Sequence, residues 1–126
     1  MNAFLFIFIG GGLGSLARYA LASAVGQITG PGFPWGTLAV NILGGFVMGM
    51  LVEMMALKWS VPQEIRLFLT TGLMGGFTTF SAFSLECASM IERGDWGMAG
   101  AYVFSSVIGS ILALFAALFL IRNVVA

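Results

Sequence analysis

The sequence contains no histidine and only one cysteine, Cys87. Histidine is the commonest general base near neutral pH and the commonest metal ligand. A catalytic site or a metal site in this chain would therefore have to use other residues. A single cysteine excludes an internal disulfide and a cysteine-based metal cluster. The serines have no histidine or lysine close by in the sequence, so no nucleophile–base pair supports an enzyme.

Charged residues are also scarce, at 8% of the 126 residues, and the formal net charge is zero. A soluble domain carries charge on about a quarter of its residues, so this chain has too little for a surface that faces water. The hydrophobic content of 60% and the mean hydropathy of +1.05 instead predict a surface that faces a lipid bilayer. The zero net charge gives no support to a nucleic-acid partner.

Hydrophobic segments divide the chain into stretches of helix length. Because a bilayer core about 30 Å thick takes roughly 20 apolar residues per helix, the length holds about four spans in one domain. A cluster of glycine and proline at residues 26–32 separates the first two segments, and a charged turn at residues 92–95 separates the last two. We expect an all-α membrane protein whose transmembrane helices span residues 3–25, 35–57, 61–91 and 97–121.

The third segment is unusual in its length and in its middle. Residues 61–91 would extend ~46 Å as one straight helix, which exceeds the hydrocarbon core. Residues 75–81 read GGFTTFS, and paired glycines followed by hydroxyl residues form a poor helix centre. We therefore predict two half-helices that meet at residues 75–79. Since backbone groups freed at membrane depth are tolerated only in a protein-lined site, the break also predicts a binding site.

Small residues recur four apart in every segment, which lets helix backbones approach closely in lipid. Ordinary packing within the chain explains any one such pair. All four together favour an oligomer, since they exceed what a lone four-helix bundle needs. The pairs are Gly10 and Gly14, Gly45 and Gly49, Gly72 and Gly76, and Ser105 and Gly109.

The basic residues do not define an orientation in the membrane. With four spans, Lys58, Arg66 and Arg122 lie on one side, and Arg93 lies on the other, together with Arg18 if its side chain snorkels that way. The positive-inside rule needs a clear excess on one side, and none exists. We expect insertion in both orientations, which allows an antiparallel dimer with a two-fold axis in the membrane plane.

Ionisable residues within the spans are candidates for function. Arg18 lies well inside the first span, where its guanidinium either reaches the interface or helix-end carbonyls, or attracts anions in a vestibule. Glu86 lies one or two turns from the end of the third segment, and vestibule and functional roles are both open. The other carboxylates lie near span ends, where we expect them to be solvated: Glu53, Glu64, Glu92 and Asp95.

Polar side chains at helical spacing form two further candidate groups. Thr37 and Asn41 are four apart on the second segment, and an amide such as Asn41 has several hydrogen-bonding groups to satisfy. A single serine or threonine in lipid usually bonds another helix, whereas a stripe of three hydroxyls on one helix face indicates a polar track. That stripe is Tyr102, Ser106 and Ser110, and the hydroxyls beside the break are Thr78, Thr79 and Ser81.

Phenylalanines recur every three residues after the glycine pair, at Phe77, Phe80 and Phe83. Such a stripe is usually core packing, but here it adjoins irregular backbone. Phenyl edges carry partial positive charge and can face an anion. Together with the neutral amide and hydroxyl donors, these rings predict a narrow conduit for a small ion or solute.

Three blocks of this sequence resemble the Fluc (CrcB) family of fluoride channels. They are residues 10–19, which read GGGLGSLARY, residues 36–46, which read GTLAVNILGGF, and residues 72–83, which read GLMGGFTTFSAF. The third block is highly specific, and length and helix number also agree. There are departures: Ala82 stands where the family often has a hydroxyl residue, and Ser15 stands where alanine is common.

The resemblance implies an antiparallel, dual-topology homodimer in the bacterial inner (plasma) membrane, with two pores for passive fluoride export. It implies a fluoride pathway lined by Asn41, Thr79, Phe80, Ser81, Phe83, Tyr102, Ser106 and Ser110. It also implies a structural sodium ion at the dimer centre, bound by the backbone carbonyls of Gly75 and Thr78. Arg18 and Glu86 match the family's vestibule positions.

Two other functions compete with a channel. A small multidrug transporter also has four helices, but it needs a membrane-buried carboxylate for proton coupling, and the first segment contains no acid. A non-transporting membrane scaffold would explain the small-residue faces, but neither the interrupted helix nor the polar track.

Overall fold

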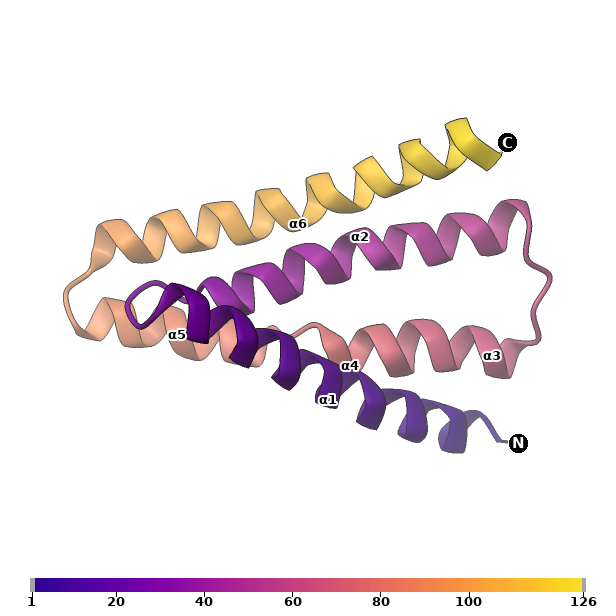
Figure 1. Cartoon of the computed structure of the whole chain (residues 1–126), viewed down its shortest axis with the longest axis horizontal. Coiled ribbons are helices and arrows are strands. Elements are labelled where there is room, and N and C mark those ends of the chain that lie inside the picture. The colour runs from indigo at the N-terminus through magenta and orange to yellow at the C-terminus, as the bar shows by residue number, and fades with distance from the viewer. Residues whose placement is uncertain (1, 126) are drawn as a thin grey trace.

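The structure is a computed structural model that describes residues 2–125, and within them it contains helices and no strand. Three helices are long and apolar enough to cross a membrane: α1 (Ala3–Thr29), α2 (Trp35–Leu57) and α6 (Trp96–Val125). α2 and α6 run side by side, and α1 crosses the third segment near α4 (Figure 1). The expectation of an all-helical, multi-pass membrane protein is confirmed.

Two expected helix ends are wrong. α1 continues past Gly26 to Thr29, because the Gly26 carbonyl still accepts the N–H of Gly30 at 2.8 Å and the backbone turns only at Gly30 and Gly32, with φ of 77° and 116°. Positive φ is the conformation that glycine tolerates best, so these two residues end the helix. At the other end of the chain, α6 runs to Val125, four residues beyond the expected end at residue 121.

The third segment consists of several short elements. They are α3 (Gln63–Leu67), a π-helical stretch η1 (Phe68–Met74), α4 (Gly75–Phe77) and α5 (Ser81–Glu92). The first begins two residues later than expected, since Pro62 is extended (φ −63°, ψ 161°). The backbone leaves helical geometry at Thr78 (φ −84°, ψ 158°), so the glycine pair lies inside α4 and the hydroxyl residues follow it.

Glycines bring α1 against the first half of this segment. A Cβ at Gly10 would lie 2.6 Å from the Phe68 carbonyl oxygen, and a Cβ at Gly72 would lie 3.0 Å from that of Ile7. A Cβ at Gly14 would overlap the Leu73 carbonyl. The two backbones are therefore in direct contact, which only glycine permits.

The same device joins α2 to α6. A Cβ at Gly45 would lie 2.8 Å from the Ser110 carbonyl oxygen, and one at Gly49 would lie 2.7 Å from that of Leu114. These small residues serve contacts within one chain. Because packing of α1 on the third segment and of α2 on α6 already uses most of them, their number does not by itself require an oligomer, and the oligomer stays a prediction.

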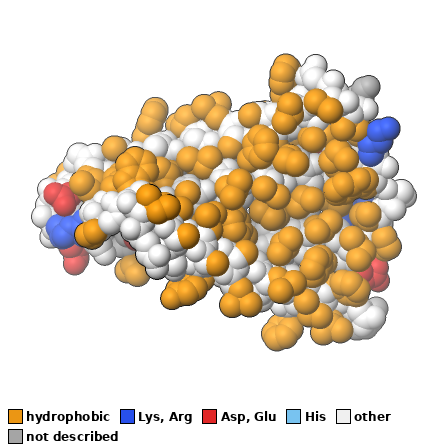
Figure 2. Space-filling model, viewed as in Figure 1, with side chains coloured by type: hydrophobic (Ala, Val, Ile, Leu, Met, Phe, Trp, Pro, Cys, Tyr) orange, Lys and Arg blue, Asp and Glu red, His pale blue; other side chains and the backbone are white. Residues whose placement is uncertain are grey.

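Hydrophobic side chains cover the face seen in Figure 2, and charged side chains gather toward its two ends. This distribution is the one expected of a protein that spans a bilayer. One expectation about charge is wrong: Glu53 is buried rather than solvated. It lies where α2 packs against α6, and Nε of Arg122 donates a hydrogen bond to its Oε2 at 2.7 Å.

Candidate functional site at the interrupted third segment

The backbone of Thr79 finds its hydrogen-bond partners on another helix. In a continuous helix the N–H of Thr79 would donate to the carbonyl of Gly75. It donates instead to Oδ1 of Asn41, at 2.8 Å, and Nδ2 of Asn41 donates to the Thr79 carbonyl at 3.0 Å. A single side chain on α2 thus satisfies both backbone groups of the residue that follows the end of α4.

Thr79 also starts the next helix. Its hydroxyl accepts a hydrogen bond from the N–H of Ala82, at 3.0 Å, and lies 3.3 Å from the hydroxyl of Ser81. A side-chain oxygen that accepts the N–H three residues later is a helix N-cap. The interruption is therefore a defined structure in which Thr79 connects α2 to the start of α5.

Because the N–H groups of Thr79 and Ala82 donate to side-chain oxygens, carbonyl oxygens near the end of α4 stay available. Within residues 2–125, no hydrogen bond reaches the carbonyl of Gly75 or that of Thr78. In the same part of the chain, no group of three histidine, cysteine, aspartate or glutamate side chains is placed to hold a metal. Neutral backbone oxygens are suitable ligands for a hard cation, so the local chemistry fits a sodium ion at these two residues.

Many of the predicted residues meet at one cavity of about 440 Å³ between α2, the interrupted segment and α6. Its remaining walls are glycine and apolar side chains, and it is open along one side. The predicted residues that line it are Asn41, Gly75, Thr78, Thr79, Phe80, Phe83, Ser106 and Ser110.

The two phenylalanines of the cavity differ in exposure. The Phe80 side chain is 77% exposed, whereas that of Phe83 is only 8% exposed. Their ring centroids lie 5.6 Å apart with the planes inclined at 45°, and Phe83 continues the aromatic contacts to Tyr102 at 5.0 Å. Phe83 is thus part of the packed core, while Phe80 lies at the open side of the cavity.

The hydroxyl of Ser106 is the one buried side-chain polar atom in residues 2–125 that lacks a hydrogen-bond partner. Ser106 is 6% exposed and lines the cavity. An unsatisfied buried hydroxyl costs about 1–3 kcal/mol, which a polar occupant of the cavity would recover. Ser106 is therefore a candidate ligand-binding group.

Tyr102 does not continue this lining, although it shares a helix face with Ser106. It is fully buried, and its hydroxyl donates to Oε1 of Glu86 at 2.7 Å. The hydroxyl of Thr37 donates to Oε2 of the same carboxylate at 3.1 Å. The predicted stripe of three hydroxyls is thus divided, and Tyr102 holds Glu86 in place.

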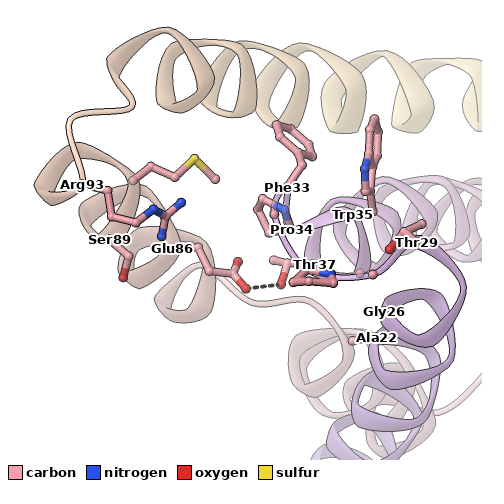
Figure 3. Close-up of a pocket in the computed structure, with 15 residues that line it drawn as sticks. Ala22, Gly26, Thr29, Phe33, Pro34, Trp35, Thr37, Glu86, Ser89 and Arg93 are labelled. Atoms are coloured by element: carbon pink, nitrogen blue, oxygen red, sulfur yellow. Dashed lines mark hydrogen bonds between the residues drawn. The ribbon is translucent and has the colours of Figure 1, made fainter.

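Glu86 lies at a second cavity of about 430 Å³ near the α1–α2 turn. Figure 3 shows Glu86 and Thr37 pointing toward each other, with Ser89 on the same helix as Glu86 and Arg93 directly after its end. We did not predict Ser89 or Arg93 from the sequence. Ser89 lies three residues after Glu86 on one face of α5, a spacing that was available as a signal, and Arg93 follows the end of that helix.

Arg18 is not among the residues that line either of these cavities within the described chain. Its Nε donates a hydrogen bond to the carbonyl of Gly76 at 3.0 Å. Of the alternatives that the sequence left open for Arg18, the structure shows the hydrogen bond to a helix-end carbonyl.

Comparison with known proteins gives this site a family. Residues 5–118 match the family described as CrcB-like protein, Camphor Resistance (CrcB). The chain belongs to the CrcB family. A relative from Chelativorans sp. (strain BNC1) is 52% identical over 124 residues, which cover 98% of this chain and 99% of that protein. A relative from Rhodospirillum centenum (strain ATCC 51521 / SW) is 47% identical over 126 residues and covers both chains completely.

A third relative, from Agrobacterium fabrum (strain C58 / ATCC 33970), is 51% identical over 114 residues, or 90% of this chain and 91% of that protein. All three relatives are named fluoride-specific ion channel FluC. The CrcB match covers both cavities, because every residue that lines them lies between residues 5 and 118.

Proposed function

We propose that this protein is a channel that conducts fluoride passively out of the bacterial cytoplasm through the cavity beside the interrupted segment. The observation that carries this proposal is the meeting of Asn41, Phe80 and the unpartnered hydroxyl of Ser106 at one cavity. The choice of ion comes from the relatives, which are named fluoride-specific channels over nearly the whole length of this chain.

The donors of the cavity suit conduction rather than tight binding. Its lining includes an amide, hydroxyls and phenyl rings, and no lysine or arginine. Neutral donors and positively polarised ring edges replace part of an anion's hydration without holding it as a fixed cation would. An anion can therefore enter the site and leave it again.

We further propose that the working unit is an antiparallel homodimer of four-helix domains inserted in both orientations. Support comes from Phe80, whose large exposed ring lies beside polar groups at the open side of the cavity. A second copy would cover this side. Each copy contributes its own cavity, so the dimer has two fluoride pathways, in the inner membrane.

A structural sodium ion at the dimer centre completes the proposal. Gly75 and Thr78 of each copy would hold it through their carbonyls, to which no group in residues 2–125 donates a hydrogen bond. When bound, the ion supplies positive charge to the carbonyl end of α4, where the helix dipole is negative. Thr78 is also anchored through its own N–H and hydroxyl, which both donate to the Met74 carbonyl at 3.0 Å.

Glu86 lies at the entrance in this proposal. Its carboxylate is held by Tyr102 and Thr37, and Arg93 lines the same vestibule cavity. Arg93, whose Nε forms an ion pair with Oδ2 of Asp95 at 3.4 Å, brings a positive charge to the same cavity as the Glu86 carboxylate.

Ion efflux from liposomes tests the function. Purified protein is reconstituted, and fluoride and chloride release are recorded with ion-selective electrodes. We expect fluoride release without chloride release. Release of neither ion would favour a scaffold, and proton-coupled uptake of an organic cation would favour a multidrug transporter.

Orientation is tested separately. Lysines added on the side of the membrane that holds both termini should lock the chain into one orientation. Lysines added to the turns on the opposite side should lock it into the other. Each locked form alone should lose fluoride efflux, and co-expression of the two forms should restore it. Full efflux from one locked form alone would exclude the antiparallel dimer.

A further inference from the structure

The Gly76 carbonyl lies at the end of α4, and its hydrogen-bond donor comes from a distant helix. In a continuous helix the N–H of Phe80 would donate to this oxygen. The donor is instead Nε of Arg18, at 3.0 Å, from a residue 58 positions earlier in the chain. An arginine side chain thus occupies the place of a missing helical hydrogen bond.

The position of Arg18 follows from the glycines of α1. Gly10, Gly14 and Arg18 are four residues apart in sequence, so they share one helix face. The glycines place α1 in backbone contact with η1 and α4, and a Cβ at Gly14 would lie 2.8 Å from the backbone nitrogen of Phe77. One turn farther along this face, Arg18 is brought to the end of α4.

Electrostatics favours a cation here. The carbonyl end of a helix carries partial negative charge, and a positively charged side chain stabilises it. A carbonyl without a donor at membrane depth would cost free energy. Arg18 meets both needs at Gly76, which directly follows Gly75 and lies two residues before Thr78.

We propose that Arg18 is a positioning residue that acts through its Nε–H. By holding the Gly76 carbonyl, it keeps the end of α4 in the geometry that leaves the Gly75 and Thr78 carbonyls for the cation. Arg18 does not attract fluoride. This inference rests on the cation site of the proposed function and adds the residue that orients it.

Variants of chosen side-chain length distinguish the effect of the Arg18 hydrogen-bond donor from the effect of its charge. In glutamine, Nε2 is as many bonds from Cα as Nε is in arginine, so Arg18→Gln keeps the donor and removes the charge. Arg18→Lys keeps the charge but moves the nitrogen one bond farther out. Arg18→Met has the length of glutamine and no donor. Arg66→Gln, at an exposed residue of α3, is the control.

The experiment measures thermal unfolding of each purified dimer in detergent as sodium replaces a bulky organic cation, together with fluoride efflux from liposomes. Arg18→Gln and Arg66→Gln should respond to sodium as the unsubstituted protein does. Loss of the donor to the Gly76 carbonyl should raise the sodium concentration for half-maximal stabilisation about tenfold or more in Arg18→Met and Arg18→Lys. Fluoride efflux should follow the same order.

Other patterns overturn the inference. If Arg18→Lys matches the unsubstituted protein while Arg18→Gln behaves like Arg18→Met, the charge acts and the donor does not. If all Arg18 variants are normal, or if all three are equally defective, the Nε bond has no positioning role. If the unsubstituted dimer shows no response to sodium, the proposed cation site is excluded. The role of Arg18 is then tested by fluoride efflux alone, in which Arg18→Gln should exceed Arg18→Met and Arg18→Lys.

Discussion

Asn41 and Thr79 are joined by two hydrogen bonds, since the Asn41 amide accepts the N–H of Thr79 at 2.8 Å and donates to its carbonyl at 3.0 Å. An amide nitrogen has two hydrogens, and the carbonyl of Thr79 uses one of them. The second is available to an occupant of the cavity that Asn41 lines. The same side chain thus holds the interruption together and offers a donor to an anion.

Asn41→Asp should lower both stability and fluoride efflux. A carboxylate keeps an acceptor for the Thr79 N–H, but it loses the donor to the carbonyl and repels an anion. The lost donor leaves that carbonyl unsatisfied at about 1–3 kcal/mol, and we expect efflux to fall at least about tenfold. Liposome efflux and thermal unfolding measure the two effects. Asn123→Asp, at an exposed asparagine near the end of α6, is the matched control, and equal effects of both variants would contradict this role.

Phe80→Ile should impair fluoride efflux while the dimer stays intact on gel filtration. The Phe80 ring is 77% exposed within one chain, so its loss should change the free energy of unfolding of the chain by no more than about 0.5 kcal/mol. Phe83→Ile alters a packed core residue and should cost about 1–3 kcal/mol. Normal efflux through the Phe80 variant would exclude a role for its ring edge.

Ser106→Ala should separate stability from conduction. Its hydroxyl is buried and unpartnered within residues 2–125, so removing it relieves a desolvation cost and leaves stability unchanged or raises it, by up to about 1–3 kcal/mol. Efflux should nevertheless fall, because the pathway loses a donor. The control is Ser105→Ala, whose hydroxyl bonds the Ala101 carbonyl on its own helix. A large loss of stability in Ser106→Ala would show that the hydroxyl has a structural partner.

The pair of Glu53 and Arg122 should respond unequally to neutralisation. The side chain of Glu53 is 12% exposed and that of Arg122 is 58% exposed. Arg122→Gln leaves a buried carboxylate without its cation and should cost about 3–5 kcal/mol, whereas Glu53→Gln leaves an exposed guanidinium that water solvates and should cost much less. Thermal unfolding in detergent measures both. Equal losses would mean that Glu53 is hydrated in the membrane-bound protein.

Much of the candidate site could be predicted from the sequence, because its signals are local. Hydropathy and helix breakers located the hydrophobic segments, and the GGFTTFS stretch identified where regular hydrogen bonding is hard to maintain. The polar residues and phenylalanines that line the cavity beside the interrupted segment were candidates at that stage, whereas apolar lining residues such as Met48, Met74 and Val107 were not. Exact helix ends were less accurate: Gly26 stays helical, with its carbonyl bonded to the N–H of Gly30, and positive φ occurs only from Gly30 on.

The sequence by itself determined that this is an integral membrane protein, because a chain with few charges and long apolar segments has a surface suited to lipid and not to water. Only the tertiary structure decided which polar groups are hydrogen-bond partners of one another. Tyr102 bonds Glu86 instead of lining the main cavity, Glu53 is buried against α6, and Arg18 reaches Gly76. The reason is that such partners depend on how closely helices approach, and glycine contacts between backbones distant in sequence set that approach.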